Sequence, residues 1–416
     1  MTRTARVPQP TVVSEARHPP GNVFYVLHKT PSKKGHQVTR VLLAHPGAEL
    51  YGSDRMAVAT VAALTRTGFE VTVAVPNDGP LLDLFRDAGA DVVIIALPVL
   101  RKSLLRPLQL LRLVATMPAT LIRAVGLIRR SSADLLYVNT ITQPWWIAAG
   151  RLARIGVIAH VREAESELSN LLKRLLSLPL TFAHAIPCNS RATEEHVHRF
   201  GLWTKSKTSL LYNGKDWSRY LEVPPTSTVA AKVVLLLVGR ISPRKGTDTA
   251  VEATAILRGR GYPVHLTLVG DVFPGYEWFP EQLRADAQRL EIADHVEFAG
   301  FSPDPVGAFA SANIVIVPSR VEPFGTVAAE GMAAARCTVV ARTQGLVEIV
   351  DSPVVGSTFE PGDAKGLADA CAALIEDPEG ATLIASAGRE SVVARFSTEG
   401  YATETVKLVS DLVRSR

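Results

Sequence analysis

The sequence predicts an α/β protein built from two doubly wound parallel sheets that face each other across a cleft. Short apolar runs alternate with longer segments of helical period. Such runs are too short for helices and are typical of parallel strands that are buried on both faces. The alternation stops once, near residue 221, and then restarts. A length of 416 residues suits two domains at roughly 150 residues each.

The first domain is predicted over residues 39–220, where helices between the apolar runs make the architecture α/β. Residues 1–38 precede it and are expected to form a loosely ordered leader, in which residues 23–27 could add a short edge strand. The predicted strands of the first domain are residues 41–44, 71–75, 92–97, 135–138, 157–161, 185–188 and 209–212.

A proline-rich segment, residues 221–231, fits neither period and is predicted to link the domains. The second domain follows over residues 232–395, and residues 396–416 are expected to form a C-terminal helix that could cross back to the first domain. Ligands bind doubly wound folds at the carboxyl ends of the strands, so functional residues should gather at the cleft. The predicted strands of the second domain are residues 233–238, 264–269, 295–298, 314–317, 338–341 and 354–359.

The composition excludes several classes of protein. Apolar residues make up 47% of the chain and charged residues 20%, with 29 glycines and 27 prolines, which excludes disordered and collagen-like chains. The three cysteines, Cys188, Cys337 and Cys371, form no C-x-x-C pair, so we expect a reducing cytoplasm and neither a disulfide framework nor a cysteine zinc site. No apolar run reaches the roughly 18 residues of a spanning helix, which predicts a soluble or peripheral protein.

One segment, residues 99–130, concentrates the positive charge. It holds seven basic residues and no acidic one. The whole chain has a net charge of +5, so the residues outside this segment have a net charge of −2. A surface that binds nucleic acid should be basic more broadly and carry interleaved aromatic residues, so we expect no nucleic-acid partner. Pro107 and Pro118 divide the segment into helices. These helices either lie on the anionic inner face of a membrane or pack in the core with their arginines reaching solvent.

The strongest motif is P-S-R-V-E-P-F-G-T-V-A-A-E-G-M-A at residues 318–333. It follows the predicted strand 314–317, places Glu322 in a loop, and lets Thr326 cap a helix that carries Glu330 in its first turns. A carboxylate at this edge can accept hydrogen bonds from two vicinal hydroxyls, and the N–H groups of a helix start favour an anion. The spacing therefore favours a site for a sugar and a phosphate over two structural acids.

A second motif, G-R-I-S-P-R-K-G at residues 239–246, directly follows the predicted strand 233–238. Its glycines allow the backbone to approach a ligand closely, and Arg240 and Lys245 supply two cations for a diphosphate leaving group. The P-loop order G-x-x-x-x-G-K-[ST] is missing from it, so the motif does not favour hydrolysis of a nucleoside triphosphate. Taken alone, it would fit an ordinary solvated turn equally well.

Together the two motifs resemble the donor site of the retaining nucleotide-sugar glycosyltransferases of the GT-B fold, family 4 type. The order and spacing of Gly239-Arg240, Lys245-Gly246 and Glu322-x7-Glu330 match that family. The resemblance spans roughly residues 41–413, and it is close in the second domain and loose in the first. It implies two Rossmann-like domains across a cleft, with the acceptor on the first and the donor on the second.

By this resemblance, the cations of the glycine-rich motif would hold the diphosphate of the donor. Arg240 and Lys245 would bind its oxygens beside the backbone of Gly239, and Asp271 and Phe301 would lie near the base. The family reacts on one face of the sugar, where the leaving phosphate helps to deprotonate the acceptor. Retention at the anomeric carbon is implied.

The acidic motif would hold the two sugars of the donor. The resemblance assigns the ribose hydroxyls to Glu330. It assigns the transferred sugar to Glu322 and to the amides of Phe324 and Gly325, at the helix start formed by Thr326.

The first domain contributes two candidate residues. Gly52 lies in the loop 47–53 after the first predicted strand, where many relatives have a Gly-Gly pair and this chain has a single glycine followed by Ser53. His160, near the end of the predicted strand 157–161, occupies a position that resembles the active-site histidine of the family, beside the sugar. A lone histidine at a strand end is otherwise more often a structural residue.

No metal site is predicted. The chain contains no D-x-D triplet, and its ten histidines form no H-x-x-x-H or H-E-x-x-H array. We therefore expect Arg240, Lys245 and a helix amino end to neutralise the leaving phosphate without a metal or another cofactor.

The preferred function is transfer of a hexose-like sugar to a hydroxyl of a glycan or a lipid-linked acceptor. The nucleoside of the donor can be uridine, guanosine or thymidine. The expected location is the cytoplasm or the inner face of the membrane. Two alternatives stay open. A nucleotide-sugar 2-epimerase shares the architecture but needs no acceptor. A noncatalytic membrane-surface module would need no donor, although the intact set of Arg240, Lys245, Glu322 and Glu330 argues against it.

Overall fold

The computed structural model describes residues 38–49, 52–100, 107–164, 168–226, 228, 231–272 and 275–416. The expected leader lies outside these residues except for residue 38, and so does the expected strand 23–27. Residues 101–106 of the basic segment are also outside them.

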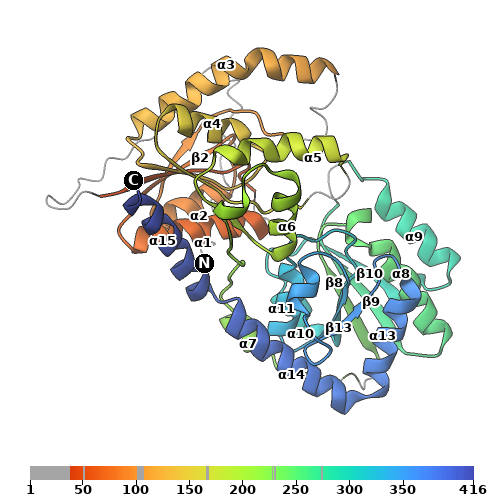
Figure 1. The fold of residues 1–416 in the computed structure, drawn as a ribbon. Coiled ribbons are helices and arrows are strands. Elements are labelled where there is room, and N and C mark those ends of the chain that lie inside the picture. The colour runs from red at the N-terminus through yellow and green to blue at the C-terminus, as the bar shows by residue number, and fades with distance from the viewer. Residues whose placement is uncertain are drawn as a thin grey trace, which may run out of the picture.

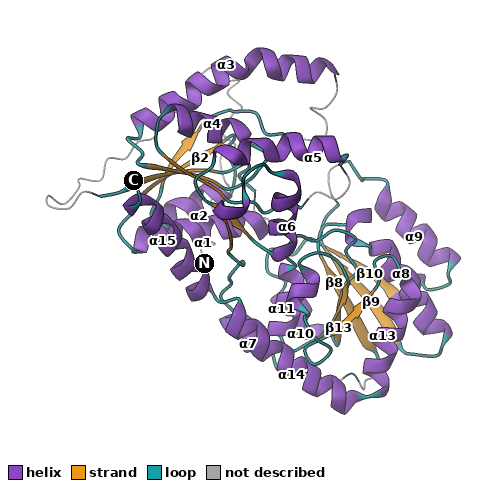
Figure 2. Ribbon diagram, viewed as in Figure 1, coloured by secondary structure: helices purple, strands orange, loops and turns teal. Residues whose placement is uncertain are grey.

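The first half of the chain forms a parallel sheet of five strands in the order β3-β2-β1-β4-β5 (Figures 1 and 2). All residues of β4 and β5 are buried, as expected for strands covered by helices on both faces. Two short strands, β6 and β7, pair in parallel beside this sheet. The predicted strands are confirmed to within about three residues at each end. The strands are β1 (Arg40–Ala44), β2 (Glu70–Val75), β3 (Asp91–Ile94), β4 (Leu135–Val138), β5 (Gly156–Ala159), β6 (Ile186–Cys188) and β7 (Thr208–Leu210).

Helices cover both faces of the first sheet, and each face has its own hydrophobic core. One core joins the sheet to α3 and α4, and the other joins it to α1, α2 and the C-terminal helix α15. The helices of this half are α1 (Gly52–Arg66), α2 (Leu81–Asp87), α3 (Pro107–Arg130), α4 (Pro144–Leu152), α5 (Asn170–Ser177), the 3₁₀ helix η2 (Leu178–Phe182), α6 (Arg191–Phe200), the 3₁₀ helix η3 (Lys205–Lys207) and α7 (Ser218–Leu221).

α3 is one continuous helix, so the expected break at Pro118 is wrong. Leu113, Met117 and Leu121 pack against the first-half core on both sides of this proline. Their packing outweighs the roughly 3 kcal/mol that a proline costs inside a helix. Among the described residues, Leu111–Arg130 of α3 is the one stretch long and apolar enough to cross a membrane by length and composition alone, and 28% of it is buried against the protein.

The second half forms a parallel sheet of six strands in the order β10-β9-β8-β11-β12-β13 (Figure 2). The predicted strands are again confirmed to within about three residues. Its strands are β8 (Val233–Val238), β9 (Val264–Val269), β10 (Val296–Gly300), β11 (Ile314–Val317), β12 (Cys337–Ala341) and β13 (Ser357–Phe359). Its helices are η4 (Pro243–Lys245), α8 (Thr247–Gly259), α9 (Phe279–Arg289), η5 (Ala293–His295), α10 (Val306–Ser311), α11 (Thr326–Ala333), α12 (Leu346–Ile349), α13 (Ala364–Glu376) and α14 (Pro378–Arg395).

The chain passes between the halves twice, and the two crossing segments lie side by side. Lys215 forms a β-bridge with Ser397, and the Trp217 indole donates a hydrogen bond to the Phe396 carbonyl at 3.0 Å. After the second crossing, α15 (Thr398–Arg414) packs against α1 of the first half (Figure 1). Both crossings thus form one joint beside the cleft.

Candidate active site

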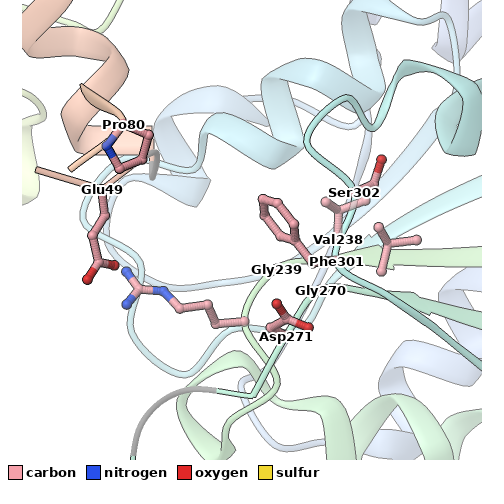
Figure 3. A pocket seen from close by; sticks show the side chains of 10 residues that line it. Glu49, Pro80, Val238, Gly239, Gly270, Asp271, Phe301 and Ser302 are labelled. Atoms are coloured by element: carbon pink, nitrogen blue, oxygen red, sulfur yellow. The ribbon is translucent and has the colours of Figure 1, made fainter. Parts of the chain in front are cut away.

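A cavity of about 330 Å³ lies between the two halves, at the carboxyl ends of strands of the second sheet (Figure 3). Glu49 and Pro80 line it from the first half. The opposite wall comes from the ends of β8, β9 and β10, namely Val238, Gly239, Arg240, Val269, Gly270, Asp271, Phe301 and Ser302. This is the position at which doubly wound sheets bind ligands.

The cavity brings together four of the predicted donor-site residues, Gly239, Arg240, Asp271 and Phe301. Phe301 is 53% exposed, so one face of its ring is available for stacking against a planar base. Figure 3 shows Asp271 and Phe301 on the second-half wall, across the cavity from Glu49. The cavity therefore offers a cation, an acid and an aromatic face.

Two glycines let the loops after β8 and β9 meet at this wall. Gly270 has φ +150, and a Cβ atom placed on it would lie 2.0 Å from the Gly239 carbonyl oxygen. No side chain fits at that distance. The second glycine, Gly239, also has φ +150, and its amide donates to the Val269 carbonyl at 2.8 Å.

A third glycine, Gly246, holds the two motifs against each other. It has φ +67, and a Cβ atom on it would lie 2.0 Å from the Pro318 carbonyl oxygen. The Arg320 amide donates to the Arg244 carbonyl at 2.8 Å next to this contact. The glycine-rich turn is thereby pressed against the loop that carries Glu322.

Lys245 and Glu322 form an ion pair at the edge of the cavity. The Lys245 Nζ lies 2.5 Å from the Glu322 Oε2, and a Cβ atom on Gly239 would lie 4.0 Å from the same Nζ. Burial raises the pKa of the Glu322 carboxyl, but the Lys245 cation, Arg244 and the Ser319 hydroxyl together outweigh burial and hold the pKa below its ordinary value. Glu322 is therefore an ionised hydrogen-bond acceptor at neutral pH.

Glu330 has a partner that the sequence analysis missed. This carboxylate, 7% exposed, pairs with Lys215 of the first crossing segment. The same ammonium group donates to the Tyr220 hydroxyl at 2.8 Å. Lys215 and Glu330 are 115 residues apart, so no local spacing could have linked them. Glu330 does not line the cavity of Figure 3, and its predicted contact with a ribose stays a prediction.

The start of α11 differs from the expectation. Thr326 was expected to cap the helix, but it is the first helical residue, and Gly325 is the N-cap with φ +108. The left-handed backbone favours glycine at this position, and a Cβ atom on Gly325 would also lie 2.6 Å from a Leu346 methyl group. The Phe324 ring is buried near Tyr212, 6.3 Å between ring centroids. Because its side chain is used in packing, Phe324 can contribute only backbone groups to a ligand.

His160 is fully buried at the end of β5. Its Nδ1 lies 2.6 Å from the Tyr137 hydroxyl and 3.2 Å from the Arg162 Nη2. Its Nε2 is buried and has no hydrogen-bond partner among the described residues. Burial lowers the pKa of the imidazole well below its ordinary value, and the Arg162 cation lowers it further. The histidine is therefore neutral at physiological pH.

Arg162 organises the surroundings of His160, and the sequence analysis did not single it out. Its guanidinium donates to the side-chain oxygens of Asn139 at 2.9 Å and Asn213 at 2.7 Å, and to the Tyr401 hydroxyl at 3.0 Å. These acceptors come from the loop directly after β4, from the segment that leads to the first crossing, and from α15. One buried cation thus ties the C-terminal helix to His160, which does not line the cavity of Figure 3, so its predicted place beside the sugar stays a prediction.

We predict that this buried histidine makes the protein less stable in acid. Below about pH 6.5 the unfolded chain takes up a proton at residue 160 that the folded chain cannot bind. The free energy of unfolding should therefore decrease as the pH is lowered, by at most about 1.4 kcal/mol per pH unit for this one group. The melting temperature can be measured between pH 5 and 8, roughly the range in which an ordinary histidine titrates. As the pH is lowered, it should decrease less steeply for His160→Gln than for the wild type. His184 and His196 also have a pKa lowered to about 4, mainly by burial, but they are present in both proteins and contribute equally. Equal dependence of the melting temperature on pH in the two proteins would therefore contradict the prediction.

Glu348 of α12 connects the second half to the first. Its carboxylate accepts hydrogen bonds from the amides of Arg191 at 2.9 Å and Ala192 at 3.1 Å, at the start of α6, and from the Tyr212 hydroxyl at 2.9 Å. Negative charge at a helix amino end is favourable. The turn before Glu348 also contacts the loop that carries Glu322, because the Gly345 amide donates to the Glu322 carbonyl at 3.1 Å.

Gly52 begins α1, and it is not among the residues that line the cavity. Its predicted contact with the donor stays a prediction. Among the described residues, no group of three or more His, Cys, Asp or Glu side chains is placed to hold a metal ion.

Two family models match the chain, one in each half. Glycosyltransferase Family 4 matches residues 50–219, and Glycosyl transferases group 1 matches residues 225–391. The chain belongs to the GT-B glycosyltransferases of the family 4 type. The second match contains the glycine-rich motif, which contributes to the cavity wall, and the motif that carries Glu322, the partner of Lys245. This agrees with the resemblance found in the sequence.

Two similar proteins are a lipopolysaccharide core biosynthesis glycosyltransferase and a glycogen synthase. The lipopolysaccharide core biosynthesis glycosyltransferase LpsE of Rhizobium meliloti is 30% identical over 227 residues, which are 54% of this chain and 64% of that protein. Glycogen synthase of Mycobacterium tuberculosis is 28% identical over 228 residues, 54% of this chain and 53% of that protein. The chain thus spans between half and two thirds of these relatives.

Solved structures share the fold over nearly the whole chain. The crystal structure of Anabaena HepE in complex with UDP has a TM-score of 0.76 at 24% identity and covers 90% of this chain and all of its own. Sucrose-phosphate synthase from Thermosynechococcus elongatus has a TM-score of 0.73 at 22% identity and covers 91% of this chain. At these identities the likeness establishes the GT-B fold.

Proposed function

We propose that this protein transfers a sugar from a nucleotide diphosphate sugar to an acceptor hydroxyl, with retention at the anomeric carbon and without a metal ion. The observation that carries the proposal is the cavity between the halves, where Arg240, Asp271 and Phe301 converge and the Lys245–Glu322 pair borders the wall. A cation, an acceptor and a ring face are what a nucleotide diphosphate needs for recognition.

The charge of the leaving diphosphate would be balanced by the protein itself. Arg240 lines the cavity, and the Lys245 ammonium lies next to Gly239 on its wall. Preorganised cations at the position where negative charge develops lower the barrier, because they need no rearrangement during the reaction. Glu322, held ionised by Lys245, would accept hydrogen bonds from hydroxyls of the transferred sugar.

The first donor to test is a uridine diphosphate sugar. HepE, which shares the fold, has been crystallised with UDP-glucose and with UDP and glucose. The half-exposed Phe301 and the Asp271 carboxylate could recognise a base at the same wall. Guanosine and thymidine diphosphate sugars are the comparison donors.

We propose a glycan or lipid-linked acceptor, reached from the cytoplasm or from the inner face of the membrane. Two similar proteins in Rhizobium meliloti are named for lipopolysaccharide core biosynthesis. α3 exposes Leu111, Val114 and Ile122 to solvent beside the basic residues Arg112 and Arg123. Such a helix can lie on an anionic lipid surface.

The test is turnover of a panel of nucleotide sugars with the purified full chain, with and without a set of glycan and lipid-linked acceptors. We expect release of the nucleoside diphosphate that depends on the acceptor, and a product that keeps the anomeric configuration of the donor by NMR. Thermal stabilisation by each nucleotide sugar identifies the donor before the acceptor is known.

A chelator in excess should leave this turnover unchanged, since the leaving phosphate is neutralised by Arg240 and Lys245. Loss of activity in the chelator would reject metal independence. Epimerisation of the donor without an acceptor, or the absence of binding by every nucleotide sugar, would reject transfer itself.

A further inference from the structure

An unusual surface lies on the first half, and its residues are not among those that line the cavity. It is formed by α5, the 3₁₀ helix η2 and residues 199–207, which follow from the end of α6, and we refer to it as the α5 surface. Large apolar side chains are exposed on it by 43% to 80%. These side chains are Leu171, Leu175, Leu178, Phe182, Leu202 and Trp203.

The parts of the α5 surface are joined by direct contacts. The Thr181 hydroxyl of η2 donates to the Leu202 carbonyl at 3.0 Å, and the Lys207 ammonium donates to the Thr181 carbonyl at 2.6 Å. The Lys173 ammonium of α5 lies 5.4 Å from the centroid of the Phe200 ring. The segments that carry the exposed apolar residues thus contact one another, whereas exposed apolar residues on a soluble protein are normally scattered singly.

The charged residues that belong to the α5 surface itself are all basic. Residues 168–182 and 199–207 contain Lys173, Arg174, Arg199, Lys205 and Lys207 and no aspartate or glutamate. Long basic side chains can keep their charges at the level of anionic headgroups while their methylene stems cover apolar surface. An apolar patch with basic residues around it matches the chemistry of an anionic lipid surface.

Trp203 is the most exposed large apolar residue of the protein region described, at 80%. Its backbone has φ +50, a left-handed conformation that residues other than glycine rarely adopt. Packing within the protein does not explain an indole held in this way. A ring with an apolar body and one N–H donor is suited to the boundary between headgroups and acyl chains.

We propose that the α5 surface binds an anionic lipid bilayer, with Trp203 and the exposed leucines of α5 entering the headgroup boundary. α4 packs against both α3 and η2, so the α5 surface adjoins the side of the first half that carries α3 (Figure 1). A second copy of this chain is a poor occupant, because its own α5 surface would bring the same five cations into contact.

The experiment measures flotation of the full-length protein with vesicles, in the absence of donor and acceptor. One set of vesicles is phosphatidylcholine alone, and the other contains roughly 30% phosphatidylglycerol, enough to give a negative surface potential. We expect binding to the anionic vesicles only, and weaker binding when the salt is raised from about 0.1 M to about 0.5 M. The double variant Leu175→Ser/Trp203→Ser should bind at least ten-fold more weakly, since it removes two apolar side chains from the buried contact.

Two variants make the result specific. Trp278→Ser removes another exposed tryptophan, 54% exposed on the second half, and should bind vesicles like the wild type. Ile122→Ser removes an exposed residue of α3, which separates the two surfaces. Both α5-surface substitutions are at exposed positions, so the melting temperature should stay unchanged and report that the variant is folded.

Several outcomes would overturn the proposal. Equal binding of the double variant and the wild type, loss of binding in Trp278→Ser, or loss in Ile122→Ser alone would each show that the α5 surface is not the lipid site. No binding to anionic vesicles would reject it outright, as would a dimer in light scattering that the double variant abolishes. Because no step uses a sugar donor, failure here leaves the proposed transfer untouched, and failure of the transfer assay leaves this proposal untouched.

Discussion

Lys245→Met is expected to lower kcat by roughly 100- to 1000-fold, the range seen when one preorganised donor to a developing charge is removed. The ammonium group lies at the wall of the cavity, 2.5 Å from the Glu322 carboxylate. Its loss removes a cation from the leaving diphosphate. It also leaves the Glu322 carboxyl buried without the charge that lowers its pKa. Steady-state turnover with saturating donor and acceptor measures the effect.

The control for this variant is Lys365→Met, at an exposed lysine that pairs with Asp369 on α13. It removes the same charge from the chain but should change kcat less than two-fold, because exposed ion pairs contribute little. Lys245→Arg should recover part of the rate, since a cation is kept at the wall. A Lys245→Met enzyme that folds and retains more than a tenth of the wild-type kcat would refute the assigned role.

Gly246→Ala is expected to destabilise the second half by roughly 2–5 kcal/mol, the sum of left-handed backbone strain and overpacking. Gly246 has φ +67, and an added Cβ atom would lie 2.0 Å from the Pro318 carbonyl oxygen. Because the obstacle is backbone, the glycine-rich turn has to move away from the loop that carries Glu322. We therefore expect weaker stabilisation by nucleotide sugars as well as a lower melting temperature.

The helix that begins directly after Gly246, α8, provides a matched control, Gly259→Ala. Gly259 is the last residue of α8, and an added Cβ atom would meet nothing within 4 Å. This variant should melt at or slightly above the wild-type temperature, since alanine is favoured over glycine in a helix. Equal melting temperatures for Gly246→Ala and the wild type would show that the contact with Pro318 is not rigid.

Hydrophobic alternation was sufficient to predict both sheets, because parallel strands that are buried on both faces must be apolar at every position. Two local expectations were wrong. The sequence favoured a break at Pro118, but core packing on both sides of that residue keeps α3 helical through it. Thr326 is a good capping residue, yet Gly325 takes the cap because the turn requires a left-handed backbone there.

The sequence by itself determined the two α/β halves, the family and the motifs around Arg240, Lys245, Glu322 and Glu330, because these depend on residue type and short spacing. Only the tertiary structure decided which of these groups meet. It paired Lys245 with Glu322 and gave Glu330 a partner in Lys215, 115 residues away. Spacing along the chain does not predict these pairs. The contact of Gly246 with Pro318 determines how closely the two motif loops approach each other, and the first crossing segment brings Lys215 to Glu330. The same reason applies to the α5 surface, whose residues become one patch only after η2 folds against the loop that carries Trp203.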